Sequence, residues 1–290
     1  MLQTRTRFGS ARKRRIPAPL ARTLFRIPLI IWSVVVVYPI IWMFLGAFKD
    51  YGEIFRSPWA LPSSWEFDNF VQAWTDFNIG QSFFNSLLVT ALGCVLCVFL
   101  ALTTSYAIER VRFRGSQVLF NIYLSAMMIP MVLGWIPLFF LLLQWHLIDN
   151  LWALSVIYAV TQVPFTVFIL TSFLGTVPRD LEEAAAIDGL SQYGILFRVV
   201  APLMTTGIIT ASIMNAVMFW NEYFMALIFL QSEEKNTLGV TMDLMSDSAE
   251  YTNAWGALLA GLSIAVIPII VIYAIFQRNI VRGMTEGAFK

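Results

Sequence analysis

Six segments of this chain are long and apolar enough to cross the roughly 30 Å hydrocarbon core of a membrane, which takes about 20 residues of helix. Together they contain one formally charged side chain, that of Glu222. They lack the alternation of apolar and polar residues seen in barrel strands, and a helix satisfies its own backbone hydrogen bonds in lipid. We therefore expect six membrane helices, at residues 27–48, 84–108, 118–143, 151–175, 203–230 and 256–276.

The composition excludes an ordinary soluble fold. Hydrophobic residues make up 58% of the 290 residues and charged residues 13%, whereas soluble domains contain about 45–50% and about 25%. The predicted fold class is an all-α polytopic membrane protein. Membrane helices tolerate proline, so the prolines inside the six segments predict kinks rather than breaks; they are Pro28, Pro39, Pro130, Pro137, Pro164 and Pro268.

The distribution of charge predicts the orientation in the membrane. If the N-terminus is cytosolic, the cytosolic segments are 1–26, 109–117, 176–202 and 277–290, and they hold 16 of the 19 Lys and Arg residues. Positive residues concentrate on the cytosolic side of membrane proteins. We therefore expect a basic cytosolic segment at 1–26, a transmembrane domain at 27–276 and a cytosolic tail at 277–290. The basic run at 12–15 is interpreted as a topology anchor rather than a nucleic-acid site.

The cytosolic loop at 176–202 has the signals of two short helices. Pro178 and three acidic residues favour the start of a helix, and three alanines then favour its continuation. Gly189 is predicted to end it, and Ser191 to cap the second helix. A helix lying on lipid carries basic residues on its polar face, whereas this one is acidic and rich in alanine. A protein partner is therefore favoured over the membrane surface.

This loop resembles the EAA loop of ABC importer permeases. The matching residues are Glu183-Ala184-Ala185, Asp188-Gly189, Phe197 and Pro202, while Ala201 departs from the larger aliphatic residue usual before the proline. The C-terminal residues Gly283, Thr285, Gly287, Ala288 and Lys290 resemble the ending of carbohydrate-uptake permeases of the maltose-type G branch. Weaker matches extend the resemblance over about residues 25–290.

The resemblance implies a subunit of a binding-protein-dependent importer for a sugar or oligosaccharide in the bacterial inner membrane, working by alternating access. Its partners would be a second homologous permease, two ATPase subunits and an extracytoplasmic substrate-binding protein. Glu183, Ala184, Ala185, Asp188 and Gly189 would couple the permease to an ATPase. The tail residues Gly283, Thr285, Gly287 and Lys290 would contact the ATPase as well.

No enzyme or cofactor site is expected in this chain. A P-loop requires a lysine after a glycine, and none of the four lysines follows one, so ATP and Mg²⁺ would be used by the partner ATPase. Cys94 and Cys97 have metal-like spacing, but they lie in the middle of a span without other ligands, so we interpret them as packing residues and expect no metal. His146 lies in a short external loop and is interpreted as a satisfied or solvated histidine rather than as a site.

Four polar residues in the spans are candidates for the substrate path: Asn221, Glu222, Gln162 and Asn215. A charge within the bilayer usually faces a cavity or a partner. Glu222 therefore belongs to the path, to a polar contact between helices of the permease subunits, or to the membrane interface, which its side chain would reach by snorkelling. The tryptophans of the outer loop 49–82 serve either as an interface belt or as a docking surface for a binding protein.

The rival functions are a permease for a non-sugar solute, such as a glycerol phosphodiester or a polyol, and a self-sufficient secondary transporter. The latter would need ion sites near the midplane, and a single carboxylate within the spans disfavours it.

Overall fold

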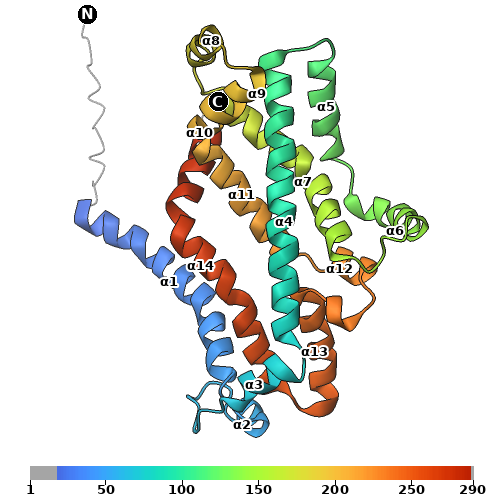
Figure 1. Cartoon of the computed structure of the whole chain (residues 1–290). Coiled ribbons are helices and arrows are strands. Elements are labelled where there is room, and N and C mark those ends of the chain that lie inside the picture. The colour runs from blue at the N-terminus through green and yellow to red at the C-terminus, as the bar shows by residue number, and fades with distance from the viewer. Residues whose placement is uncertain (1–17, 289–290) are drawn as a thin grey trace, which may run out of the picture.

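The computed structural model describes residues 18–288, and every regular element in that range is a helix (Figure 1). Four helices are long and apolar enough to cross a membrane unbroken. They are α1 (Ala18–Gly46), α4 (Ile79–Tyr106), α7 (Leu151–Leu174) and α14 (Trp255–Ala288). These helices confirm the predicted polytopic, all-helical class. Two bent helix pairs bring the number of candidate spans to six if each pair counts as one span.

The core forms where α4 and α7 pack along each other, with α11 (Thr205–Trp220) against both. By contrast, α1 leans away from the other helices and packs mainly against α14 (Figure 1). Of the most apolar 18-residue window in α1, 6% is buried, against 56% in α7. The bundle therefore consists of a packed centre and one peripheral helix.

The third segment is not the kinked but continuous helix predicted for 118–143. Helix α5 (Ser116–Ala126) ends before Pro130, and the chain resumes in a 3-10 turn, η2 (Met131–Gly134), and α6 (Trp135–Gln144), at a bend of 96°. Pro130 has an extended backbone. Proline has no N–H group to donate and disfavours helical geometry in the residue before it, which explains a break at this point.

The fifth segment, predicted at 203–230, is divided as well. The chain that leads into it, Gln192–Leu203, lies at 80° to α11 and includes α9 (Gln192–Ile195), a π-helical turn, η3 (Leu196–Val200), and α10 (Ala201–Leu203). After α11 the chain leaves the helix for three residues and re-enters it at α12 (Phe224–Phe229). The prediction of one continuous helix is therefore wrong here too.

Three short helices lie at the end of the bundle opposite α8 (Asp180–Ile187), as Figure 1 shows. They are α2 (Tyr51–Arg56), α3 (Asp68–Thr75) and α13 (Leu238–Thr252), and a short 3-10 turn, η4 (Glu233–Lys235), precedes α13. Around them a second core forms with the start of α14. Lys49 is almost fully buried and donates hydrogen bonds to the carbonyl oxygens of Ser57 and Pro58, so the loop before α3 is internally fixed.

Candidate functional site

The segment 176–202 forms the helix, glycine turn and capped second helix that its sequence predicts. Helix α8 ends at Ile187, and Gly189 adopts φ +86°, a left-handed conformation that costs other residues a Cβ clash. The side chain of Ser191 then accepts a hydrogen bond from the amide of Gly194, which caps α9. The element lies at one extreme of the molecule (Figure 1).

Most of the predicted coupling residues are exposed on this element. Glu183, Ala184, Asp188 and Gly189 face outward, whereas Ala185 is 8% exposed and packs into the main core. The predicted small-residue face is therefore divided between the outside and the core.

Two large side chains that the sequence analysis did not single out are strongly exposed beside this element. Ile187 is 87% exposed and Tyr193 is 76% exposed. Exposed apolar residues rimmed by polar ones are typical of a protein contact surface. The sequence feature that could have identified these two residues is a large apolar side chain on the otherwise polar side of a short helix.

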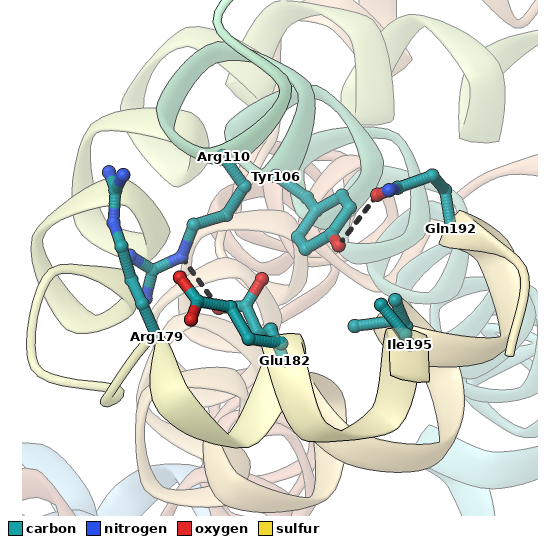
Figure 2. A pocket seen from close by; sticks show the side chains of 8 residues that line it. Tyr106, Arg110, Arg179, Glu182, Gln192 and Ile195 are labelled. Atoms are coloured by element: carbon teal, nitrogen blue, oxygen red, sulfur yellow. Dashed lines mark hydrogen bonds and ion pairs between the residues drawn. The ribbon is translucent and has the colours of Figure 1, made fainter. Parts of the chain in front are cut away.

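A cavity of about 210 Å³ lies beneath α8, where the element meets the end of α4 (Figure 2). Across it, Nε of Arg110 lies 2.8 Å from a carboxylate oxygen of Glu182, and both side chains are nearly buried. The hydroxyl of Tyr106 donates to the side-chain oxygen of Gln192 at 3.1 Å. The lining residues are Tyr106, Arg110, Arg179, Glu182, Glu183, Ala186, Gln192 and Ile195.

Arg110 also satisfies the C-terminal end of α7. Its Nη2 atom donates to the carbonyl oxygens of Leu174 and Val177, each at 2.7 Å. The last carbonyl groups of a helix lack partners within the helix and attract cations. A single guanidinium group therefore binds the end of one membrane helix and the start of the exposed element.

Glu222 lies in the break between α11 and α12. Its carboxylate accepts hydrogen bonds from the amides of Met225 and Ala226 at 2.8 and 3.1 Å, and from the hydroxyl of Tyr158 on α7. These bonds satisfy the first amides of α12 and join it to α7. Among the predicted roles, the observed geometry is that of a contact between helices. The neighbouring Asn221 is exposed and donates to the carbonyl oxygen of Val217.

Asn215 and Gln162 have different surroundings. Asn215 has no exposed surface and donates to Thr166 on α7 at 3.1 Å and to Cys97 on α4 at 3.5 Å, so it joins three helices. Cys97 is thus a packing residue, as predicted. Gln162 is partly exposed beside a cavity of about 530 Å³, where its amide donates to the sulfur of Met218.

The loop before α7 is held by an ionic contact to the loop after α12. Lys235 lies 2.8 Å from the carboxylate of Asp149, which also accepts from the amides of Gln231 and Ser232. Partial burial opposes ionisation of Asp149, but these hydrogen bonds hold the pKa of its carboxyl group well below its usual range. His146 is exposed with φ +55°, which agrees with its interpretation as a solvated loop residue.

The tail residues are only partly described. Gly283, Thr285 and Gly287 belong to the last turns of α14, which continues as a helix to Ala288. Lys290 lies outside the described residues. No group of His, Cys, Asp or Glu side chains suited to a metal occurs within the described part of the chain.

A bundle of candidate membrane helices with an acidic, exposed helical element at one end is typical of a polytopic membrane protein with a surface for a partner. Residues 100–286, more than half of the chain, match the model of the family described as binding-protein-dependent transport system inner membrane component. The chain belongs to this family, and its predicted place among ABC importer permeases is confirmed. It is therefore a transport subunit rather than an enzyme.

Several curated proteins are similar over nearly the whole chain. The diacetylchitobiose uptake system permease protein NgcG of Streptomyces coelicolor is 34% identical, over 90% of this chain and 87% of that protein. The arabinooligosaccharides transport system permease protein AraQ of Bacillus subtilis is 32% identical, over 93% and 95%.

A solved structure has the same fold. A chain of a bacterial ABC transporter involved in the import of the acidic polysaccharide alginate superimposes with a TM-score of 0.79 at 24% identity. The match covers 94% of this chain and 99% of that one. The overall fold of this chain is therefore one already known from a solved structure.

Proposed function

We propose that this chain is a six-span permease subunit of a binding-protein-dependent importer that moves a sugar or oligosaccharide into the cell. The observation that carries the proposal is the exposed, acidic α8 followed by a positive-φ glycine, on a chain of the permease family. The relatives named for the uptake of diacetylchitobiose and arabinooligosaccharides support a carbohydrate. Transport would be driven by ATP hydrolysis on two partner ATPase subunits.

In this proposal α8 is the coupling helix. Glu183, Ala184 and Asp188 would face the ATPase, with Ile187 and Tyr193 as apolar contacts, and Gly189 would hold the turn between them. The tail residues Gly283, Thr285, Gly287 and Lys290 would contact the same partner, and the end of α14 lies at the α8 end of the bundle (Figure 1). Closure of the ATPases on ATP would then move the membrane helices by alternating access.

The cavity beside Gln162 is our candidate for this chain's share of the substrate path. Its lining contains apolar side chains, including Met127, Met131, Phe165 and Met218, and no charged residue. The amide of Gln162 has only a weak thioether acceptor there. Such a surface suits the C–H faces and hydroxyl groups of a neutral sugar better than an anion.

Uptake by the purified complex tests the proposed function. The permease, its partner permease, the ATPases and the binding protein are reconstituted in liposomes, and uptake of labelled oligosaccharides, a polyol and a glycerol phosphodiester is measured. We expect uptake of at least one oligosaccharide that requires both ATP and the binding protein. Uptake of only the polyol or the phosphodiester would reject the carbohydrate assignment, and uptake without ATP would favour a secondary transporter.

Cysteine labelling tests the proposed topology of six spans with both termini in the cytosol. In a Cys94→Ser, Cys97→Ser background, single cysteines are placed at the exposed positions Ala60, Ser246 and Ala184. An impermeant maleimide added outside should modify the first two and leave the third unmodified until the membrane is permeabilised. External labelling at Ala184 would contradict the proposal, because α8 must face the ATPase.

A further inference from the structure

We infer that Arg110 is a positioning residue that fastens the coupling helix α8 to the membrane helices α4 and α7. The inference rests on the proposed function, since it explains how a movement of α8 would reach the spans. Figure 2 shows the guanidinium group of Arg110 directed at Glu182 across the cavity beneath α8.

The covalent connection alone would leave α8 poorly constrained. Five residues, 175–179, separate the end of α7 from the start of α8. Arg110 donates to the carbonyl oxygen of Leu174, the last residue of α7 before this linker, and to that of Val177 in the middle of the linker. Its remaining contact reaches past the linker to Glu182 in the first turn of α8. The linker therefore cannot swing without breaking these three interactions.

The arrangement needs an arginine in particular. Nη2 of the planar group donates to two carbonyl groups while its Nε lies 2.8 Å from a carboxylate oxygen. The compact ammonium of lysine, a single point charge, does not reproduce this spread of contacts. The side chains of Arg110 and Glu182 are 7% and 12% exposed. Removing one partner of such a pair leaves a nearly buried charge without compensation, which is strongly unfavourable.

A second contact acts on the other side of the glycine turn. Tyr106 lies four residues before Arg110 on the same continuous helical segment and donates to Gln192 at the start of α9. The π-helical turn η1 (Ala107–Val111), which carries Arg110, follows directly. Such turns are often found at functional positions. The end of α4 thus holds the coupling element both before and after Gly189.

The neighbouring ion pairs provide matched controls. Glu109 lies 3.3 Å from Arg112 and 3.7 Å from Arg179, and the side chains of both arginines are exposed. Exposed pairs contribute little. An Arg112→Gln substitution therefore removes a positive charge from the same surface without touching the buried pair.

The experiment compares Arg110→Lys, Glu182→Gln, the double variant and Arg112→Gln in the assembled, reconstituted complex. The quantity measured is the number of substrate molecules imported per ATP hydrolysed. We expect this ratio to fall about 5- to 150-fold in both single variants, the usual range of a coupling energy, and to stay at the parent value in Arg112→Gln. The double variant should be no worse than the poorer single one, because both remove the same interaction.

Hydrogen exchange of the α8 amides provides a readout that does not depend on transport. In the assembled complex without substrate, exchange over 180–190 should be faster in Arg110→Lys and Glu182→Gln than in the parent. Unchanged exchange, an unchanged ratio or additive losses would overturn the role of Arg110. If the parent complex imports no sugar, the proposed substrate fails, while the exchange data still decide whether Arg110 fastens α8.

Discussion

Replacing Glu183 with lysine is expected to abolish import while the permease still inserts into the membrane and assembles with its partner permease. Glu183 is exposed in the first turns of α8, so its carboxylate contributes little to the fold of this chain. Loss of one partner of a charge pair that is buried and hydrogen-bonded in a protein contact costs about 2–5 kcal/mol, and a reversed charge adds repulsion. We expect import and substrate-stimulated ATP hydrolysis to fall by about 100-fold or more.

Gly189→Val should have the same effect for a different reason. Apart from Gly189 and its two neighbours in the chain, no residue has an atom within 4 Å of the position that a Cβ would occupy, so the cost comes from the local backbone at φ +86°. A residue with a Cβ pays roughly 1–2 kcal/mol there, and a β-branched one is strained further. Gly189→Asn is the control, because asparagine tolerates this conformation. Full transport by Glu183→Lys and Gly189→Val would reject coupling through α8.

Replacing Glu222 with leucine is expected to destabilise the permease itself. The hydroxyl of Tyr158 and the amides of Met225 and Ala226 would lose their acceptor. Each buried donor without a partner costs about 1–3 kcal/mol. We expect a clearly lower melting temperature in detergent and less protein in the membrane, with a smaller loss for Glu222→Gln, which keeps an acceptor oxygen.

Asn221→Ala is the matched control for this prediction. Asn221 is the adjacent residue, is exposed and bonds only to the backbone of its own helix. The melting temperature of the Asn221→Ala permease should lie within about 1 °C of the parent value, since surface substitutions usually change the free energy of unfolding by less than about 0.5 kcal/mol. A Glu222→Leu permease with the melting temperature of the parent and no uptake would instead place this carboxylate on the substrate path.

The sequence predicted the features that depend on local chemistry. Long apolar segments are recognisable one at a time, and so are the acidic start of α8, its alanines and the glycine after it. The breaks at Pro130 and after Trp220 were not predictable by the same means, because membrane helices tolerate proline and polar residues when neighbouring helices supply partners. For Glu222 that partner, Tyr158, lies 64 residues away along the chain.

The candidate site shows the same limit. Glu183 and Gly189 belong to a contiguous pattern, but the contact between Arg110 and Glu182 joins η1 to α8, two elements that only the packing of α4 against α7 brings together. Likewise, Asn215 could be recognised as a polar residue within a span, but its burial among Cys97 and Thr166 depends on the rotation of three helices. Polarity is visible in the sequence, whereas the direction of a side chain is not.

The sparse packing of α1 determines which parts of this protein are free to vary. Most of its described apolar side chains are exposed in this chain, so these positions of α1 require hydrophobicity rather than a particular side-chain shape. Exchanges among Leu, Ile, Val and Phe there leave the interior of this chain undisturbed. In α7, whose buried side chains fill a close-packed interior, adding or removing one methylene group disturbs the packing and lowers stability. Mutational tolerance should therefore rise steeply from the centre of the bundle to α1.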